Sequence, residues 1–185
     1  MDDIVKAALR KWPNVPACRG WLGLDARGDW WMRDDRAQAA GPFPASRGSP
    51  VRHDKLREFI GRNYQADADG CWFFQNGPQK VFVELEAAPL VIGVHRDEAG
   101  ALHLATHAGR AVAQVLAVLL DEAGRLYLHT PDGLGLVRSA DMDTAADEVL
   151  AGRWVPEAVA AQALPARFGF VPSPQRQAPE SAKPA

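Results

Sequence analysis

The sequence predicts an α+β protein, built mostly from antiparallel β-hairpins in two small lobes with a few packed helices. Three observations lead to this class. Short strand-like runs alternate with tight-turn signals, the pattern Asp-x-x-Gly recurs, and apolar residues at helical spacing occupy only a few segments. At 185 residues the chain is long enough to bury a core without a metal or disulfide.

The first lobe is expected to span residues 1–94. An apolar stripe predicts a helix near the N-terminus, capped by Asp2 or Asp3 and ended by Pro13. Phe59 and Ile60 follow Leu56 at spacings of three and four, which predicts a second helix over 54–63 with this apolar face buried. The expected strands are 21–24, 29–32, 71–75, 79–86 and 89–95.

The second lobe is expected to span residues 95–171. Its predicted strands are 101–107, 112–120, 125–130 and 134–137. Ser139 is expected to cap a helix that buries Met142, Val149 and Leu150 and stops at Gly152. A further short helix is predicted within residues 154–164, after Pro156. Residues 172–185 lack large apolar side chains, so we expect a disordered tail.

One turn pattern occurs four times, each time just before a predicted strand. It reads Asp-x-x-Gly followed, two residues on, by an aromatic residue or Leu, and it begins at Asp25, Asp67, Asp97 and Asp121. The Asp side chain accepts a backbone hydrogen bond within the turn, and Gly supplies the left-handed residue that closes it. A calcium loop is not expected, because the fifth and sixth positions from Asp67 are Cys71 and Trp72.

Composition and charge exclude several classes of protein. With 21 basic and 23 acidic residues, the net charge of −2 does not favour nucleic-acid or membrane binding. The longest apolar run, 111–120, is too short to span a membrane, which needs about 20 residues. The N-terminus is acidic, and the two cysteines are far apart, so we expect free thiols and a cytoplasmic location.

No motif in the chain predicts catalysis, a metal or a cofactor. Nucleophile-elbow, Walker and Rossmann patterns are absent from the sequence. His103 and His107 share a strand face but lie about 13 Å apart, too far to hold one ion. His95 and His103 are expected on opposite faces of their hairpin. We therefore predict no catalytic or metal-binding residue and no cofactor.

The hairpin that contains Trp72 offers the best candidate contact surface. A two-residue loop at 76–77 or 77–78 places Trp72 and Phe74 on a core face. The opposite face then combines aromatic and polar side chains, which is typical of a groove or partner surface. The predicted binding residues for a protein partner or small ligand are Phe73, Gln75, Lys80, Phe82, Glu84 and Glu86. A three-residue loop would exchange the faces, and another layer of the protein could cover the phenylalanines.

Two other functions compete with this interpretation. Glu84 and Glu86 lie about 7 Å apart on one strand face, so with a histidine from the second lobe they could serve a small hydrolase or lyase. A nucleic-acid accessory role is the weaker alternative. It rests on a basic run through the second predicted helix, formed by Arg47, Arg52, Lys55, Arg57 and Arg62.

Residues 21–94 also resemble a known type of protein. The resemblance rests on the segments 28–30, 49–51, 69–73, 77–81 and 83–91, the last ending in Glu-Ala-Ala-Pro-Leu-Val. It is to small bacterial domains of unknown function with repeated hairpins in a two-lobed, β-rich fold. The resemblance implies a signalling or regulatory role and no catalytic residue. We therefore expect a non-enzymatic cytoplasmic binding or regulatory module.

Overall fold

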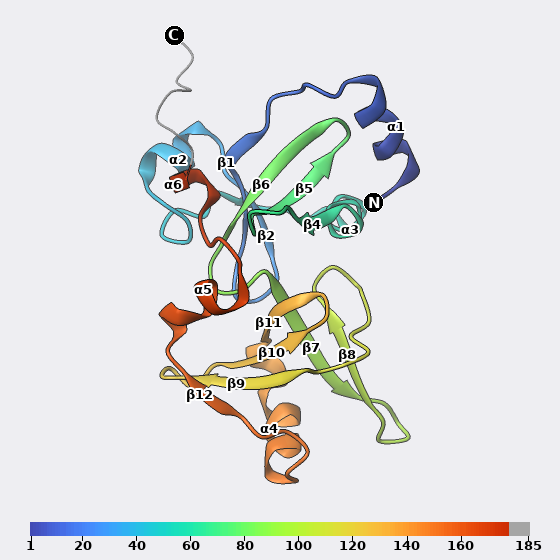
Figure 1. The fold of residues 1–185 in the computed structure, drawn as a ribbon, viewed down its shortest axis with the longest axis vertical. Coiled ribbons are helices and arrows are strands. Elements are labelled where there is room, and N and C mark those ends of the chain that lie inside the picture. The colour runs from blue at the N-terminus through green and yellow to red at the C-terminus, as the bar shows by residue number, and fades with distance from the viewer. Residues whose placement is uncertain (178–185) are drawn as a thin grey trace.

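The computed structural model describes residues 1–177 and contains two β-sheets, one in each lobe (Figure 1). The first sheet contains β1 (Cys18–Leu24), β2 (Trp30–Met32), β3 (Ser49–Pro50), β4 (Tyr64–Ala66), β5 (Trp72–Asn76) and β6 (Gln79–Leu85). Its strand order is β3-β2-β1-β6-β5-β4. The helices α1 (Asp3–Lys11), α2 (Asp35–Ala40) and α3 (Asp54–Arg62) belong to this upper lobe.

The second sheet forms the lower lobe of Figure 1. It contains β7 (Leu90–Arg96), β8 (Leu102–Thr106), β9 (Ala117–Asp121), β10 (Leu126–Thr130), β11 (Gly133–Val137) and β12 (Glu157–Val159), in the order β12-β9-β10-β11-β7-β8. The short helix η1 (Ser139–Asp141) leads into α4 (Met142–Leu150). Most strand pairs in both sheets are antiparallel, and β1–β6, β7–β11 and β9–β12 are parallel. The predicted α+β class is confirmed.

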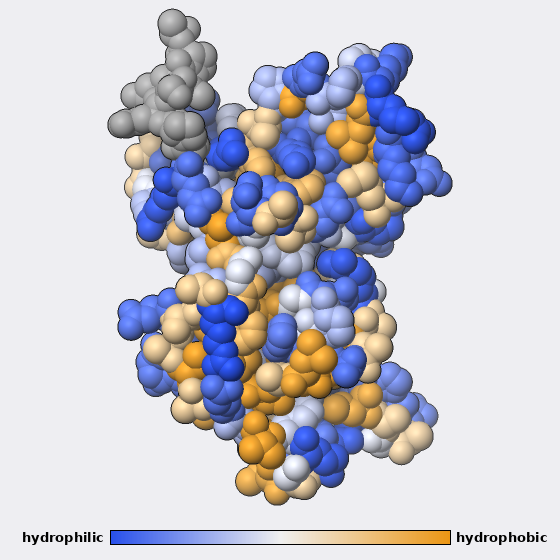
Figure 2. Space-filling view, in the orientation of Figure 1, coloured by the Kyte–Doolittle hydropathy of each residue, from blue (hydrophilic) through white to orange (hydrophobic). Residues whose placement is uncertain are grey.

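One apolar cluster runs through both lobes. It joins Leu22 and Trp30 of the first sheet to Leu90, Tyr127 and Leu134 of the second. A separate cluster packs the far side of the second sheet against α4. The surface narrows between the lobes (Figure 2), but the shared core makes them one packed unit.

The four Asp-x-x-Gly turns form as predicted. In each turn the Asp Oδ1 atom accepts the backbone N–H groups two and four residues later, at 2.9–3.1 Å. The turn glycines are Gly28, Gly70, Gly100 and Gly124, with φ between 75° and 91°. Because all these contacts are local, the turn geometry follows from the sequence pattern.

Several predicted elements differ from the structure. The short helix predicted within 154–164 after Pro156 forms only at η2 (Ala161–Ala163), and residues 157–159 instead pair with the edge of β9 as a strand. Leu150 was expected to be buried in α4 but is 85% exposed. Glu148 is buried in its place, because Arg96 and Arg153 neutralise its carboxylate. The predicted strand 112–120 shortens to β9, and α2 and β4 were not predicted.

The chain passes from the first sheet to the second at residues 86–89, and not at 94–95, where the boundary between the lobes was predicted. The whole of β7 therefore belongs to the second sheet. The chain then continues past β12 through η2 (Ala161–Ala163) and α5 (Leu164–Phe168) and returns to the first lobe (Figure 1). Among the described residues, no helix is both long enough and apolar enough to cross a membrane.

The expectation of disorder from Pro172 is wrong for residues 172–177. The Pro172 carbonyl accepts the Leu85 N–H at 2.8 Å, and α6 (Pro174–Gln177) follows beside β6. This segment has few apolar side chains of its own, but the first sheet supplies hydrogen-bond partners. The rest of the predicted tail, 178–185, lies outside the described residues.

We expect Gly70→Ala to destabilise the protein more than Gly100→Ala. Both glycines have nearly the same positive φ, so each substitution carries a backbone strain of about 1 kcal/mol. A β-carbon at Gly100 would meet open space, whereas one at Gly70 would overlap the Gly169 carbonyl. The total loss at Gly70 should reach about 3 kcal/mol. Urea denaturation checks this comparison, and equal losses would contradict the packing of residues 169–171 on this turn.

Candidate functional site

The register of the Trp72 hairpin is the predicted one. Asn76 pairs with Gln79 and Phe73 pairs with Phe82, so the loop consists of Gly77 and Pro78. The side chains of Phe73 and Phe82 therefore share a face, with ring centroids 6.0 Å apart. Both rings are nevertheless buried, at 4% and 5% exposure, so the expectation that this face meets solvent or a partner is wrong.

The face is covered by the C-terminal strap, which we define as residues 170–177. Val171 packs against Phe73, Phe82 and Cys71. The Glu84 carboxylate accepts the Ser173 hydroxyl at 2.5 Å and the Gln175 N–H at 3.0 Å. The covering layer thus comes from a segment about 90 residues away in the sequence, which the hairpin pattern could not reveal.

The other predicted binding residues also make internal contacts. Gln75 is 1% exposed and donates to the Gly77 carbonyl, and Lys80 lies over the Phe73 ring. Glu86 accepts the Ala26 N–H and forms an ion pair with Arg47 at 3.1 Å. Among the described residues, neither Glu84 nor Glu86 contacts a histidine through a hydrogen bond, so the acid–base arrangement is not assembled.

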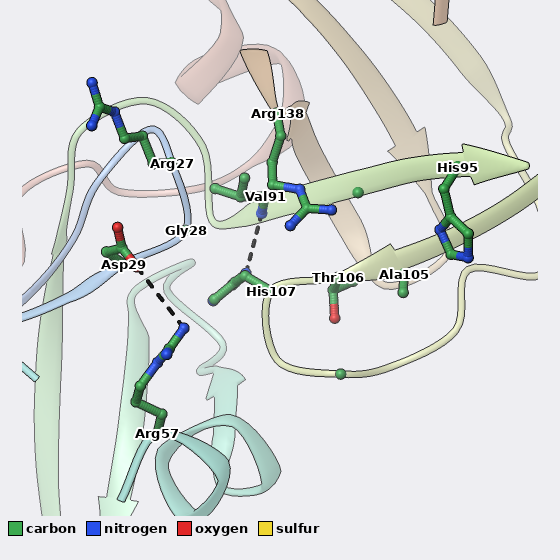
Figure 3. A pocket seen from close by; sticks show the side chains of 12 residues that line it. Arg27, Gly28, Asp29, Arg57, Val91, His95, Ala105, Thr106, His107 and Arg138 are labelled. Carbon is green, nitrogen blue, oxygen red and sulfur yellow. Dashed lines mark hydrogen bonds and ion pairs between the residues drawn. The ribbon is translucent and has the colours of Figure 1, made fainter. Parts of the chain in front are cut away.

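A cleft of about 320 Å³ lies between the two lobes (Figure 3). The first lobe contributes the turn between β1 and β2, with Arg27 and Asp29, and α3, with Arg57. The second lobe contributes one face of the β7–β8 hairpin and Arg138, which follows β11. The cleft therefore exists only because four separate segments meet.

The floor of the cleft is the outer face of β7 and β8. Gly93 lies opposite Ala105 at its centre, while Ile92 and Val94 point the other way into the core. A β-carbon at Gly93 would overlap the Arg138 guanidinium, so this glycine lets Arg138 lie across the strand (Figure 3). Because Gly93 and Ala105 are small, the floor of the cleft is flat beneath the Arg138 guanidinium.

Three arginines and one carboxylate give the cleft its charge. Arg138 is held by Asp141, whose Oδ2 atom accepts from Nε and Nη2 at 2.9 Å. Arg57 forms longer ion pairs, 3.9 Å to Asp29 and 3.6 Å to Asp54, and Arg27 forms none in the described part of the chain. These guanidinium groups retain N–H donors for an anion such as a carboxylate or phosphate.

His107 forms the inner wall beside the lobe junction. Its Nδ1 atom accepts the Val91 N–H at 3.2 Å, so the neutral ring carries its proton on Nε2. Nε2 is buried and has no hydrogen-bond partner among residues 1–177. Burial, together with nearby Arg110, lowers the pKa of His107 to about 3. At neutral pH the His107 ring is therefore uncharged and adds no positive charge to the cleft.

His95 and His103 stand at the other end of the floor. They are directly opposite each other, and their rings stack with centroids 5.4 Å apart and planes 21° apart. The prediction that they lie on opposite faces is wrong, because the four-residue turn at 97–100 pairs odd residues with odd residues. His103 also contacts Asp97 at 2.8 Å, and this hydrogen bond lowers the pKa of Asp97.

The charged groups that line the cleft are three arginines and one carboxylate. No group of three or more His, Cys, Asp or Glu side chains within the described chain could hold a metal ion. Sequence reasoning treated Arg57 only as part of a basic run and did not single out Arg27 or Arg138. One signal was present: a glycine inside a β-strand, here Gly93, often marks the close approach of another group.

These features define a two-lobed α+β protein with an arginine-lined cleft between its lobes. The chain belongs to the family DUF2944, whose model carries the description "Protein of unknown function (DUF2946)" and matches residues 1–175. The expected membership in a family of unknown function with a β-rich fold is thereby confirmed. Comparison with curated proteins finds no match.

Two solved structures of DUF1285 family proteins are similar to this chain. The one from Shewanella baltica OS155 is 21% identical with a TM-score of 0.47, and the match covers 69% of this chain and 91% of that chain. The one from Silicibacter pomeroyi DSS-3 is 16% identical with a TM-score of 0.49, and the match covers 75% and 74% of the two chains.

Replacing Glu84 should loosen the C-terminal strap. In a Cys18→Ser background, we expect Glu84→Ala to raise the rate at which a thiol reagent modifies Cys71 by about tenfold, because two strap hydrogen bonds are lost. Cys71 is 8% exposed and its Sγ lies 3.7 Å from Gln177. Glu98→Ala, at an exposed turn, is the control and should leave the rate unchanged. Equal rates in all three proteins would show that Glu84 does not hold the strap.

His107 should make stability depend on pH. The ring has a pKa near 6.5 when unfolded and about 3 when folded, so the unfolded chain binds more protons between these values. Its contribution is complete above pH 6.5 and falls, by up to about 1.4 kcal/mol per pH unit, as the pH decreases toward 3.

In His107→Gln, whose amide oxygen can still accept the Val91 N–H, this contribution disappears. We expect the free energy of unfolding to change less between pH 7 and pH 4 than in the wild type, as measured by urea denaturation. His53→Gln, at an exposed position, should retain the wild-type slope. A wild-type slope in His107→Gln would show that this ring is not buried as described.

Proposed function

We propose that this protein is a non-enzymatic binding protein that holds a small anionic molecule in the cleft between its lobes. One observation carries the proposal. Arg27, Arg57 and Arg138 come from segments far apart in the sequence and line a single cleft, in which Asp29 is the only lining carboxylate among the described residues. A cleft lined by several arginines is typical of sites for carboxylates and phosphates.

The cleft is also prepared for binding. Asp141 fixes the Arg138 side chain, and Asp141 itself accepts the Val94 N–H at 2.9 Å. The shared core holds the lobes together, so little ordering is needed when a ligand enters. Preorganised donors cost less conformational entropy on binding than free surface arginines would.

The competing functions lack such support. Glu84 is buried under the strap and Glu86 is paired with Arg47, so the hydrolase or lyase interpretation has no assembled site. In the basic helix α3, Arg57 lines the cleft and Arg62 pairs with Asp2, which does not favour a nucleic-acid surface. Cys18 and Cys71 are free, which supports the proposal that the protein works in the reducing cytoplasm.

Isothermal titration with inorganic pyrophosphate tests the proposed site. We expect binding to the wild type and at least a tenfold loss of affinity in Arg138→Gln and in Arg57→Gln, because each removes charge-assisted hydrogen bonds. Arg10→Gln, on the exposed face of α1, is the matched control and should bind as the wild type does. Absence of binding, or equal affinity in all four proteins, would refute the site.

A second substitution separates the position of Arg138 from its charge. Gly93→Ala adds a β-carbon where the Arg138 guanidinium now lies, and that guanidinium is the flexible end of its side chain. We expect the stability to change by less than about 1 kcal/mol while the affinity for pyrophosphate falls. Unchanged affinity would show that Arg138 need not lie across β7 to bind the anion.

A further inference from the structure

We propose that the anion is a nucleoside monophosphate, whose base stacks on His95 while its phosphate lies among the arginines. This inference rests on the proposed function, since it requires the cleft to bind an anion. It is carried by a second feature of the cleft, the histidine stack, which recognition of a simple anion does not need.

The cleft has two chemically different ends. At the end nearest the first lobe, Gly28 lies close to Val91, with Asp29 and Arg57 beside them, while the Arg27 side chain on the same turn points away from the other labelled side chains (Figure 3). At the other end of β7 lies His95, about 13 Å from Val91 at the usual rise of a strand. Arg138 lies between the two ends, over Gly93. A ligand that fills the cleft therefore needs an anionic part and a second part that suits an imidazole ring.

His95 offers a flat surface for that second part. It is exposed, it lines the cleft, and one face of its ring is supported by His103 at a centroid distance of 5.4 Å. Nucleic-acid bases stack on aromatic and histidine side chains in this way. The floor next to His95 has only the small side chain of Ala105, and the Arg138 guanidinium lies across the neighbouring Gly93.

Asp29, the one carboxylate among the described residues that line the cleft, also suits a nucleoside monophosphate. Asp29 is an acceptor in a site whose other charged groups are donors. Ribose hydroxyl groups are donors, and an acidic residue is the usual partner of ribose in nucleotide sites. Asp29 can therefore accept hydrogen bonds from the ribose while the arginines donate to the phosphate.

The size and charge of the cleft favour one phosphate. A volume of about 320 Å³ is near the lower limit of ligand pockets, which suits a mononucleotide better than a dinucleotide. Beyond Arg57 the cleft continues into a cavity of about 280 Å³ whose wall includes Asp54 and Glu58. Further phosphates extending into that cavity would face two carboxylates, so we expect adenosine monophosphate to bind more tightly than adenosine triphosphate.

The test compares adenosine monophosphate with ribose 5-phosphate, which has the sugar and phosphate but no base. By isothermal titration of the wild type, we expect the nucleotide to bind about tenfold more tightly, because base stacking is lost in the sugar phosphate. His95→Ala should remove this preference and leave the affinity for ribose 5-phosphate unchanged. His95→Phe, which keeps a flat ring, should retain the preference, and His53→Ala, at an exposed histidine outside the cleft, should behave as the wild type.

The outcomes separate this inference from the proposed function. If pyrophosphate binds but the wild type does not prefer the nucleotide over ribose 5-phosphate, the nucleotide is excluded and the anion site remains. If His95→Ala weakens both ligands equally, His95 acts on the phosphate and not on a base, which also overturns the inference. If none of the three probes binds, both proposals fail together.

Discussion

The junction between the lobes is the constraint on which the rest of the structure depends. Tyr64 is buried there, and its hydroxyl donates to the Pro89 carbonyl at 2.9 Å, just before β7 begins. Burial raises the pKa of Tyr64, so the phenol stays neutral and remains a donor. Its ring packs against Trp30, Trp72 and His107 at centroid distances of 4.8–5.6 Å. This packing aims the outer face of β7 at the first lobe and so creates the cleft.

Charged side chains buried inside the lobes have more hydrogen-bond partners than those that line the cleft. Buried Asp121 accepts from Arg125 and from the Tyr127 hydroxyl, and buried Arg33 donates to three backbone carbonyls. Burial alone would raise the pKa of Asp121, but these hydrogen bonds outweigh it and the pKa is lowered. Such groups are fully occupied by the fold. In the cleft, Arg57 has only long ion pairs, and Arg138 is held by Asp141 through Nε and Nη2, so other N–H donors of these two arginines remain available to a ligand.

The Trp72 hairpin shows that a local sequence pattern predicts which side chains share a face but not whether that face is exposed. The alternation of side chains along each strand, together with a two-residue loop, correctly predicted that Phe73 and Phe82 share one face. Whether that face meets water depends on what packs over it, and the cover is the C-terminal strap, whose composition resembles a disordered tail. A strap held by backbone and carboxylate hydrogen bonds leaves no apolar periodicity to detect.

The sequence by itself determined the α+β class, the hairpins and the Asp-x-x-Gly turns, because these depend on contacts within a few residues. It also indicated a family of unknown function with this β-rich fold. Only the tertiary structure decided that 157–159 would be a strand and that Arg27, Arg57 and Arg138 would surround one cleft. Those outcomes depend on contacts between segments as much as 111 residues apart, from Arg27 to Arg138, and no local pattern records which distant groups will meet.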